Sequence, residues 1–305
     1  MKIYTITLNP AYDVHAYTEH FEPFHENLAR VVSRDAGGKG VNISRALCAV
    51  GCDNVAVIVM GKDNCADFKA DVDAAGMKTI IFEKEGRIRE NLTLHTSDSD
   101  ETRISFAGFS VDDSILEEIS SAISVDDDTI VTFTGRVPTG ISMSSVKELL
   151  LTLSKKGAKI VIDSRSFSLD DIYACSPWLI KPNQEEISEY FSRDITTAEQ
   201  AVSAAEEMAT HGIENIMISL GGEGALLLCG GKLYIARPPK IEPISTIGAG
   251  DSSIAGFISA YSQGASPADC LRTAVSFGSA ACLTEGTLPP KTEDIKNIYD
   301  KVTIL

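Results

Sequence analysis

The chain has few of the residues that mark several classes of protein. It has one tryptophan and 7% aromatic residues, and its longest apolar run, residues 55–60, is the length of a strand and not of a membrane span. Basic residues are also few, with 27 Lys and Arg against 43 Asp and Glu and a formal net charge of −16. Because this charge repels nucleic acid and anionic membranes, we expect neither as a partner. An anionic substrate would need a cationic pocket of its own.

The seven cysteines are dispersed, and none forms a Cys-x-x-Cys pair or lies at metal-ligand spacing from a histidine. An odd number of dispersed cysteines is typical of reduced thiols, so we expect a cytoplasmic protein without a thiolate metal site. The N-terminal residues pass directly into a strand pattern, without the apolar segment of a secretory signal, which supports the same expectation.

Strand-like and helix-like segments alternate along most of the 305 residues, of which 44% are hydrophobic. Six β-branched runs predict strands: Ile3–Thr7, Val55–Met60, Lys78–Phe82, Thr129–Phe133, Lys159–Ile162 and Asn215–Leu220. Five segments predict helices: Val41–Val50, Cys65–Ala75, Ser114–Ile123, Ser144–Lys155 and Ala198–His211. The alternation predicts one α/β domain over residues 1–305. It should have a mostly parallel sheet, helices on both faces, and ligands beyond the carboxyl ends of the strands.

Two segments, within about residues 12–35 and 88–107, depart from this alternation. Val14–Thr18 with Arg30–Arg34, and Asn91–Thr96 with Thr102–Phe106, have the pattern of paired strands, the second pair around a turn at residues 97–100. Isolated two-stranded units are marginally stable, so these strands should pair together or pack on a partner chain. We interpret them as a small β-sheet lid, and ordinary surface hairpins are the alternative.

Residues 246–256 contain the most informative motif, in which Gly248-Ala249-Gly250-Asp251 precedes an apolar-periodic segment. The pattern predicts a loop that enters a helix N-terminus, where free backbone N–H groups and the helix dipole favour an anion. A carboxylate in the same turn can accept a proton from a hydroxyl, so the motif fits phosphoryl transfer to an alcohol. The alternative is purely structural, because Asp is also a common helix N-cap.

A second glycine cluster, Gly37-Gly38-Lys39-Gly40-Val41-Asn42, opens the first long predicted helix. Its glycines permit close approach of a ligand, Lys39 adds a positive charge and Asn42 adds an amide that can bind hydroxyls. The cluster is neither a Walker A loop nor a Gly-x-Gly-x-x-Gly motif.

The two glycine clusters together resemble the two signatures of the ribokinase-like PfkB carbohydrate kinases. Residues 7–13 (Thr-Leu-Asn-Pro-Ala-x-Asp) and Arg89-x-Asn91 are similar to the hexose-phosphate branch, 1-phosphofructokinase and tagatose-6-phosphate kinase. Asn183-x-x-Glu186 resembles the family's Asn-x-x-Glu motif, and residues 219–225 resemble its nucleotide loop. The motifs follow the family's order along essentially the whole chain. The resemblance implies a ribokinase-like three-layer sandwich with a small β-sheet lid.

The resemblance also implies ATP and Mg²⁺ as cofactors and assigns roles to individual residues. Asp251 would be the general base, and the amides of Gly248, Ala249 and Gly250 would bind the transferring phosphoryl group. Glu186 would bind Mg²⁺ through water. The residues implied to border the nucleotide are Lys181, Asn183, Ser219, Gly221 and Gly224. Lys181 could equally be a solvated lysine at a strand end, and the glycines could simply form a β-turn.

The sugar would contact Asp13, Gly38, Lys39 and Asn42, with Arg89 and Arg136 as further substrate ligands. Asp13 could instead be a turn residue, and Lys39 a surface lysine of the first helical turn.

The sequence departs from the hexose-phosphate branch where the phosphate of the sugar would bind. Leu28 occupies the position of a usual basic residue, Arg136 replaces a phosphate-binding serine, and Arg165 lies in a stretch that usually reads Asp-Thr-Ser-Gly. Arginine binds phosphate bidentately, so one hypothesis is a rebuilt phosphate pocket of Arg89 and Arg136, helped by Arg30 or Arg165. The competing hypothesis is an unphosphorylated substrate, with Arg136 held by an internal carboxylate.

We therefore expect ATP-dependent phosphorylation of a sugar-phosphate hydroxyl, with a substrate of the fructose 1-phosphate or tagatose 6-phosphate type. The alternatives are a kinase for an unphosphorylated sugar, polyol or nucleoside, and a non-catalytic ligand-binding protein on the same fold. Because lid sheets in this family often pair between subunits, a homodimer through the lid is a further expectation.

Overall fold

The computed structural model describes residues 1–98 and 101–305, so Ser99 and Asp100 of the expected turn at 97–100 lie outside the described residues. The strands are β1 (Lys2–Thr7), β2 (Ala11–Tyr17), β3 (Arg30–Gly37), β4 (Val55–Gly61), β5 (Lys78–Lys84), β6 (Arg89–His95), β7 (Glu101–Ser105), β8 (Thr129–Thr134), β9 (Lys159–Asp163), β10 (Leu179–Ile180), β11 (Asn215–Ser219), β12 (Ala225–Cys229), β13 (Lys232–Arg237) and β14 (Thr303–Ile304). The helices are α1 (Lys39–Ala49), α2 (Cys65–Ala74), α3 (Ser114–Ala122), α4 (Met143–Lys155), α5 (Leu169–Cys175), α6 (Gln184–Phe191), α7 (Ala198–Ala209), α8 (Ala249–Ser262), α9 (Pro267–Ala281) and α10 (Thr292–Tyr299). The predicted strands and helices are all present, with ends within two residues of the expected ones, except that β2 begins and β3 ends three residues beyond the expected bounds.

The central sheet is mostly parallel, as predicted. Its strand order is β14-β13-β12-β11-β10-β9-β8-β1-β4-β5. The strands from β11 to β5 in this order pair in parallel, whereas β12, β13 and β14 extend one edge in antiparallel pairing. Because the carboxyl ends of the parallel strands meet at one edge, the residues that follow them are brought together there.

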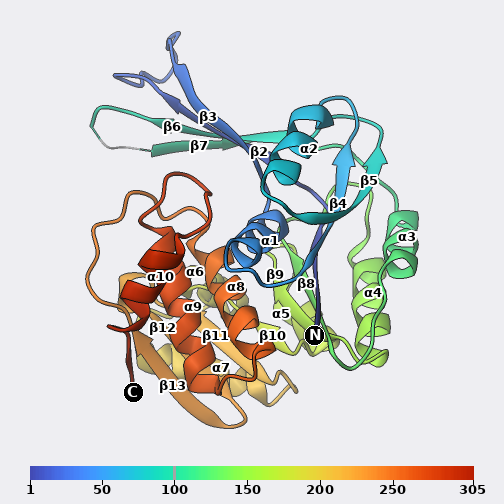
Figure 1. Cartoon of the computed structure of the whole chain (residues 1–305), viewed down its shortest axis with the longest axis vertical. Helices are drawn as coiled ribbons and strands as arrows, with labels where there is room; N and C mark the ends of the chain where they lie inside the picture. Colours follow the sequence, from blue (N-terminus) through green and yellow to red (C-terminus); the bar gives the residue numbers. More distant parts are fainter. Residues whose placement is uncertain (99–100) are drawn as a thin grey trace.

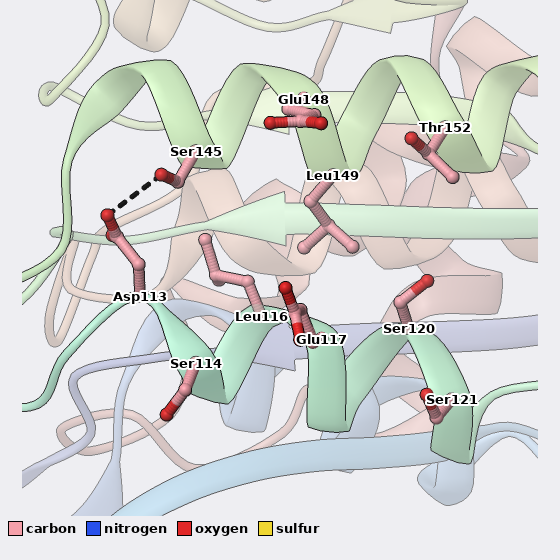
Figure 2. A pocket seen from close by; sticks show the side chains of 10 residues that line it. All are labelled: Asp113, Ser114, Leu116, Glu117, Ser120, Ser121, Ser145, Glu148, Leu149 and Thr152. Carbon is pink, nitrogen blue, oxygen red and sulfur yellow. Dashed lines mark hydrogen bonds between the residues drawn. The ribbon is translucent and has the colours of Figure 1, made fainter.

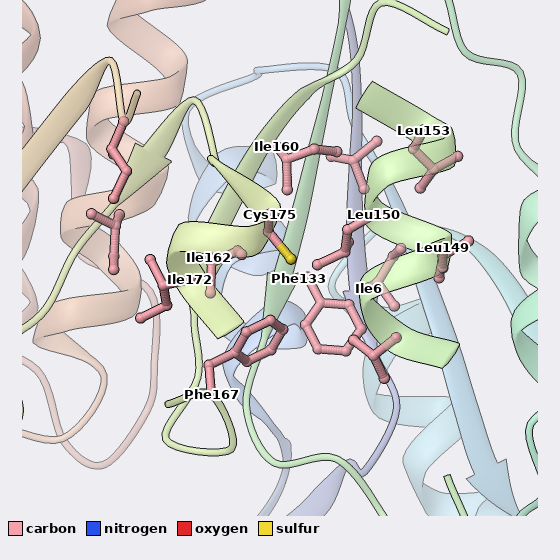
Figure 3. Close-up of a cluster of buried hydrophobic side chains, with 14 of the residues drawn as sticks. Ile6, Phe133, Leu149, Leu150, Leu153, Ile160, Ile162, Phe167, Ile172 and Cys175 are labelled. Carbon is pink, nitrogen blue, oxygen red and sulfur yellow. The ribbon is translucent and has the colours of Figure 1, made fainter. Parts of the chain in front are cut away.

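Helices cover both faces of this sheet, which gives the expected three layers. Helices α3 to α7 bury their apolar side chains against one face, and α1, α8, α9 and α10 pack against the other. Helix α2 joins α1 over β4 in a third apolar cluster. Figure 3 shows part of the first cluster, where Phe133 of β8 lies beside Phe167 with ring centroids 5.7 Å apart. These buried faces hold the strand ends at fixed positions.

The two segments that depart from the alternation form one four-stranded sheet, in the order β3-β2-β6-β7. The expected pairs β2–β3 and β6–β7 are antiparallel, and β2 and β6 pair in parallel, so the two hairpins are joined and not separate. In Figure 1 this small sheet projects from one end of the main body. Across the described ranges 1–98 and 101–305, no helix has the length and apolarity to cross a membrane.

Candidate active site

A hollow of about 480 Å³ lies where the small sheet meets the carboxyl edge of the main sheet. Its walls come from the ends of β1, β8, β9, β10 and β11, from the start of α1 and α8, and from β2, β6 and β7. Of its described lining residues, six are Lys or Arg and four are Asp or Glu. The hollow therefore provides the cationic pocket that an anionic substrate needs in a chain of net charge −16.

Asp251 lies in the first turn of α8 and is 6% exposed. Gly248 is the N-cap of this helix with φ 76°, a left-handed conformation that favours glycine. Within the described residues, the amides of Gly250 and Asp251 have no hydrogen-bond acceptor outside the helix. The helix start thus offers free N–H groups beside a carboxylate, as the sequence motif predicts. Ala249 is part of this turn, although its side chain does not line the hollow.

The carboxylate of Asp251 is held by Asn42 of α1, whose Nδ2 donates to Oδ2 at 2.9 Å. Burial raises the pKa of Asp251 to about 6, and the negative charge of Asp163 contributes to the increase. The positive charges of Lys39 and Lys181 and the hydrogen bond from Asn42 oppose it. A carboxylate of raised basicity, ionised at neutral pH, is suited to accept a proton from a hydroxyl.

Lys39 begins α1 with a side chain that is 34% exposed, but its ammonium is ion-paired and does not simply face solvent. Its Nζ lies 2.9 Å from Oδ1 of Asp163, at the end of β9, and Asp163 is 4% exposed. Burial would lower the pKa of Lys39, but the charges of Asp163, Asp251 and Glu186 outweigh burial and raise it. Lys39 therefore stays protonated in the middle of the site.

Lys181 follows β10 and is not a solvated lysine, because it is only 5% exposed. Its Nζ lies 4.0 Å from Oδ2 of Asp163. A Cβ built on Gly250 would lie 3.0 Å from the same Nζ, so the Lys181 ammonium borders the start of α8. This position supports the expected phosphate contact of Lys181.

At the small-sheet end of the hollow, Asp13, Asn91 and Arg89 form a chain of hydrogen bonds. Asn91 Nδ2 donates to Asp13 Oδ1 at 3.0 Å, and Arg89 Nη1 donates to Asn91 Oδ1 at 3.1 Å. Burial raises the pKa of Asp13, although the hydrogen bond from Asn91 lowers it. A Cβ on Gly37 would lie 2.1 Å from Asp13 Oδ2, so the glycine cluster at residues 37–40 leaves room for this carboxylate. Asp13 is thus a lining residue that β2 and β6 hold in place.

Three arginines gather near this end from different elements: Arg89 on β6, Arg103 on β7, and Arg136 after β8. Burial and the nearby positive charge of Arg136 both lower the pKa of Arg89. Among the described residues, Arg136 forms no ion pair, so the hypothesis that an internal carboxylate holds it has no support. Like-charged guanidinium groups that repel each other across a pocket favour a bound anion between them.

The other two arginines considered for this pocket have different positions. Arg165 lines the hollow, but its guanidinium is paired with Glu185 at 2.8 Å and Glu186 at 3.1 Å. Arg30 is exposed at the start of β3 and stacks on Tyr17, away from the lining residues. Of the arginines considered for a phosphate pocket, Arg89 and Arg136 are therefore the two that line the hollow without an ion-pair partner among the described residues.

Asn183 and Glu186 form a capping box at the start of α6. Asn183 Oδ1 accepts from the Glu186 amide at 2.8 Å, and Glu186 Oε2 accepts from the Asn183 amide at 3.0 Å. Arg165 Nε donates to the other carboxylate oxygen of Glu186. Each carboxylate oxygen keeps a second lone pair for water, so this set fits Mg²⁺ held through water and nucleotide phosphates. Within the described residues, no group of three or more His, Cys, Asp or Glu could hold a metal alone.

Ser219 ends β11 and lines the hollow beside Asn183, with which it forms a parallel bridge. Gly221 and Gly224 lie in the following turn, outside the lining residues. A Cβ on Gly224 would lie 2.0 Å from the carbonyl oxygen of Ala236, whereas one on Gly221 would meet nothing within 4 Å. Gly224 is therefore required by the pairing of β12 and β13, whatever its role toward a nucleotide.

Several polar lining residues were given no individual role from the sequence, although some of them lie within the motifs quoted above. The lining also contains Thr7, Asn9, Asn91, Arg103, Ser105, Asp163, Thr246 and Thr287. Five buried oxygens among the lining side chains have no hydrogen-bond partner within the described residues, on Thr7, Asn9, Asn42, Asp163 and Thr287. Buried polar atoms are normally satisfied, so these oxygens are suited to a ligand. Their position at strand ends could have identified part of this set, since Thr7, Asn9 and Asp163 all end or follow a predicted strand.

A second hollow, between α3 and α4, has a different character (Figure 2). Asp113 accepts from Ser145 there at 2.8 Å, and Leu116 and Leu149 lie between the two helices. Its described lining residues include Glu117 and Glu148 but no lysine or arginine. It therefore lacks the cations that an anionic ligand would need.

Comparison with known proteins identifies the family to which this fold and site belong. The family described as pfkB family carbohydrate kinase matches residues 5–294. The chain belongs to the PfkB family of carbohydrate kinases. This membership confirms the resemblance inferred from the glycine clusters and the predicted ribokinase-like fold.

Relatives of this PfkB kinase with similar sequences are sugar-phosphate kinases. A 1-phosphofructokinase of Haemophilus influenzae is 31% identical over 280 residues, which cover 90% of this chain and 89% of that protein. A 1-phosphofructokinase of Bacillus subtilis is 30% identical and covers 93% of both chains. The crystal structure of Escherichia coli phosphofructokinase-2 with substrates and products matches with a TM-score of 0.91 at 26% identity, over 99% of both chains. These relatives support a sugar-phosphate kinase, a phosphotransferase with an alcohol acceptor and ATP as a substrate.

Proposed function

We propose that this PfkB kinase transfers the γ-phosphoryl group of ATP to a hydroxyl of a ketohexose monophosphate of the fructose 1-phosphate or tagatose 6-phosphate type. One observation carries the choice of a phosphorylated acceptor. Arg89 and Arg136 converge on the substrate end of the hollow, and among the described residues neither has an acidic ion-pair partner. A phosphate on the acceptor would supply the missing negative charge.

In this proposal Asp251 is the general base. Its carboxylate accepts the proton of the acceptor hydroxyl while the hydroxyl oxygen attacks the γ-phosphorus. The bond between the γ-phosphorus and the bridging oxygen breaks, and ADP leaves with that electron pair. The free amides at the start of α8 stabilise the charge on the transferring group, and Lys181 borders the same turn. Asp13 and Asn42 bind sugar hydroxyls, and Gly38 and Lys39, which line the same hollow, contact the sugar beside them.

The nucleotide would lie toward the ends of β10 and β11, where Asn183 and Ser219 line the hollow. When Mg²⁺ is bound with the nucleotide, it neutralises phosphate charge. Glu186 and Asn183 would hold it through water, since the capping box already uses one lone pair on each of their oxygens. The small sheet would close over the acceptor and exclude water that could otherwise be phosphorylated.

The proposal is tested by Mg·ATP consumption with matched acceptors: fructose 1-phosphate, fructose 6-phosphate and tagatose 6-phosphate, each beside its free sugar. We expect turnover with a phosphorylated acceptor only, and its loss in Asp251→Asn. Arg136→Ala should raise KM for that acceptor by about tenfold to a hundredfold, the value of one or two charge-assisted hydrogen bonds, with a smaller effect on kcat. Arg30→Ala is the matched control, because Arg30 is exposed and outside the lining residues.

The outcomes separate the candidate functions. Turnover with free sugars only would discard the phosphorylated acceptor while the phosphoryl-transfer chemistry stands. An unchanged KM in Arg136→Ala would refute the arginine pocket. Binding of ATP without turnover on any acceptor would favour a non-catalytic ligand-binding protein.

We further propose that the kinase forms a homodimer through the small sheet. Large apolar side chains are exposed there, including Val31 (65%), Val32 (56%) and Phe106 (54%). A four-stranded sheet with such side chains in water is stabilised when a partner covers it. Sedimentation velocity should give a dimer for the wild type and a monomer for Val32→Glu, and a wild-type monomer at micromolar concentration would contradict the proposal.

A further inference from the structure

One buried carboxylate in the site has no part in the chemistry proposed above. Asp163 ends β9 and is 4% exposed, and it faces two ammonium groups. Its Oδ1 lies 2.9 Å from Nζ of Lys39, and its Oδ2 lies 4.0 Å from Nζ of Lys181. Oδ2 has no hydrogen-bond partner among the described residues. Burial of a carboxylate is unfavourable because the charge loses its hydration. Here the two lysines offset part of that desolvation penalty.

The position of these lysines matters because Asp251 lies beside them. Lys39 and Lys181 are close enough to stabilise the charge of Asp251, yet no described ion pair joins either lysine to it. Asp251 is instead held by the neutral amide of Asn42. A lysine paired directly with Asp251 would stabilise the carboxylate and reduce its basicity, which would weaken a general base.

We propose that Asp163 is a positioning residue that keeps the ammonium groups of Lys39 and Lys181 off Asp251 and directs them toward the transferred phosphoryl group. This inference rests on the proposed function of Asp251 as the base. Backbone contacts fix Asp163 in place: it pairs in register with Thr134 of β8, and its carbonyl oxygen accepts from the Gly135 amide at 3.1 Å. The carboxylate is thus anchored by the main sheet, while the lysines come from α1 and from the residue after β10.

The groups that face Asp251 determine the expected pH dependence. They are Lys39 from α1, Asp163 from β9 and Lys181 after β10, together with the neutral Asn42. Removal of the Asp163 charge takes away a repulsion and frees Lys39 to approach Asp251. Both effects stabilise the Asp251 carboxylate, so its pKa falls in Asp163→Asn.

The kinetic experiment compares the wild type with Asp163→Asn, Asp163→Glu and the control Glu185→Gln. Glu185 is an exposed carboxylate that contacts Arg165 and does not line the hollow. In Asp163→Asn we expect kcat to fall about tenfold or more and the acidic limb of kcat/KM to move about one pH unit lower. Asp163→Glu should restore the wild-type position of that limb, and the control should retain both values. A fall in kcat with an unmoved acidic limb would show a purely structural role and overturn the proposal.

A second comparison removes both partners of the ion pair, so that no unpaired Lys39 remains if Asp163→Asn folds poorly. Asp163 lies 2.9 Å from the ammonium of Lys39 and 4.0 Å from that of Lys181, so most of its effect should pass through Lys39. Asp163→Asn in a Lys39→Met background should therefore lower kcat by less than threefold beyond Lys39→Met alone. If the double variant shows the product of the two single losses, Asp163 acts independently of Lys39 and the proposal fails.

A measurement without catalysis separates failure of this inference from failure of the proposed function. Acetylation of Lys39 by acetic anhydride, followed by peptide mass spectrometry from pH 7 to 11, reports its free amine. We expect Lys39 to be unreactive in the wild type and at least tenfold more reactive in Asp163→Asn, because the ion pair that keeps it protonated is lost. Equal reactivity in both proteins would refute the positioning role even if the kinase activity is found as proposed.

Discussion

Replacement of the proposed base should make the protein more stable while it abolishes the activity. Asp251 is buried, and its pKa is raised from 3.8 to about 6. The folded state therefore binds the Asp251 proton more tightly than the unfolded chain does, and folding is weakened as pH rises from about 4 to about 6. One pKa unit corresponds to about 1.4 kcal/mol, so the ionised carboxylate costs on the order of 3 kcal/mol at pH 7.

Asp251→Asn keeps the shape of the side chain and removes this charge. The amide oxygen can still accept the hydrogen bond from Asn42. We expect the variant to raise the free energy of unfolding at pH 7.5 by about 2–3 kcal/mol, and the difference to shrink below about 1 kcal/mol at pH 4, where Asp251 of the folded protein is protonated. Urea denaturation of the ligand-free proteins at intervals between pH 4 and 8 measures this.

The pH dependence is the decisive part of that experiment. If the variant and the wild type are equally stable at all pH values, the Asp251 carboxylate is not destabilised by burial. A constant gain from pH 4 to 8 would show that the stabilisation does not come from the charge. Glu185→Gln is a suitable control, since this exposed carboxylate should change the unfolding free energy by less than about 0.5 kcal/mol.

Three further predictions concern the same site. The kcat/KM of the wild type should fall below about pH 6 as Asp251 becomes protonated, and a profile flat down to pH 5 would contradict its role as base. Gly250→Ala should lower kcat at least about tenfold, because its Cβ would lie 3.0 Å from the Lys181 ammonium; thermal unfolding should change little. Gly224→Ala should destabilise the fold by more than about 2 kcal/mol. Its Cβ would lie 2.0 Å from the Ala236 carbonyl oxygen, and Gly224 has a φ of 99°, which disfavours alanine. Gly221→Ala, in open space, should cost about 1 kcal/mol, and equal losses in urea denaturation would refute this distinction.

The main sheet and its helices were predictable because their signals are local. Period-two and period-3.6 patterns specified each of the expected elements, and these patterns arise from which side chains must face the core. The added elements β12, β13 and β14 were not anticipated as an antiparallel edge, because the direction of a strand depends on which neighbour it meets. The central strand β10 has only two residues, too few for any periodicity.

One part of the small sheet could be predicted from the sequence, and the other part depends on the folded chain. Its two hairpins were predicted from adjacent segments of alternating character, since the partners are close in sequence. The parallel pairing of β2 with β6 joins residues about 80 positions apart, such as Asp13 and Asn91, and only the folded chain brings them together. The hydrogen bond that holds Asp13 follows from this pairing.

The site divides in the same way between sequence and structure. The sequence by itself determined the glycine clusters, the candidate base Asp251 and the unusual Arg136, because a motif at a helix start carries its own chemistry. Only the tertiary structure decided that Lys39 pairs with the buried Asp163, that Lys181 is buried beside it, and that Gly224 is required by strand pairing. The physical reason is that burial and electrostatic neighbours depend on contacts between distant segments, which no local pattern of residues specifies.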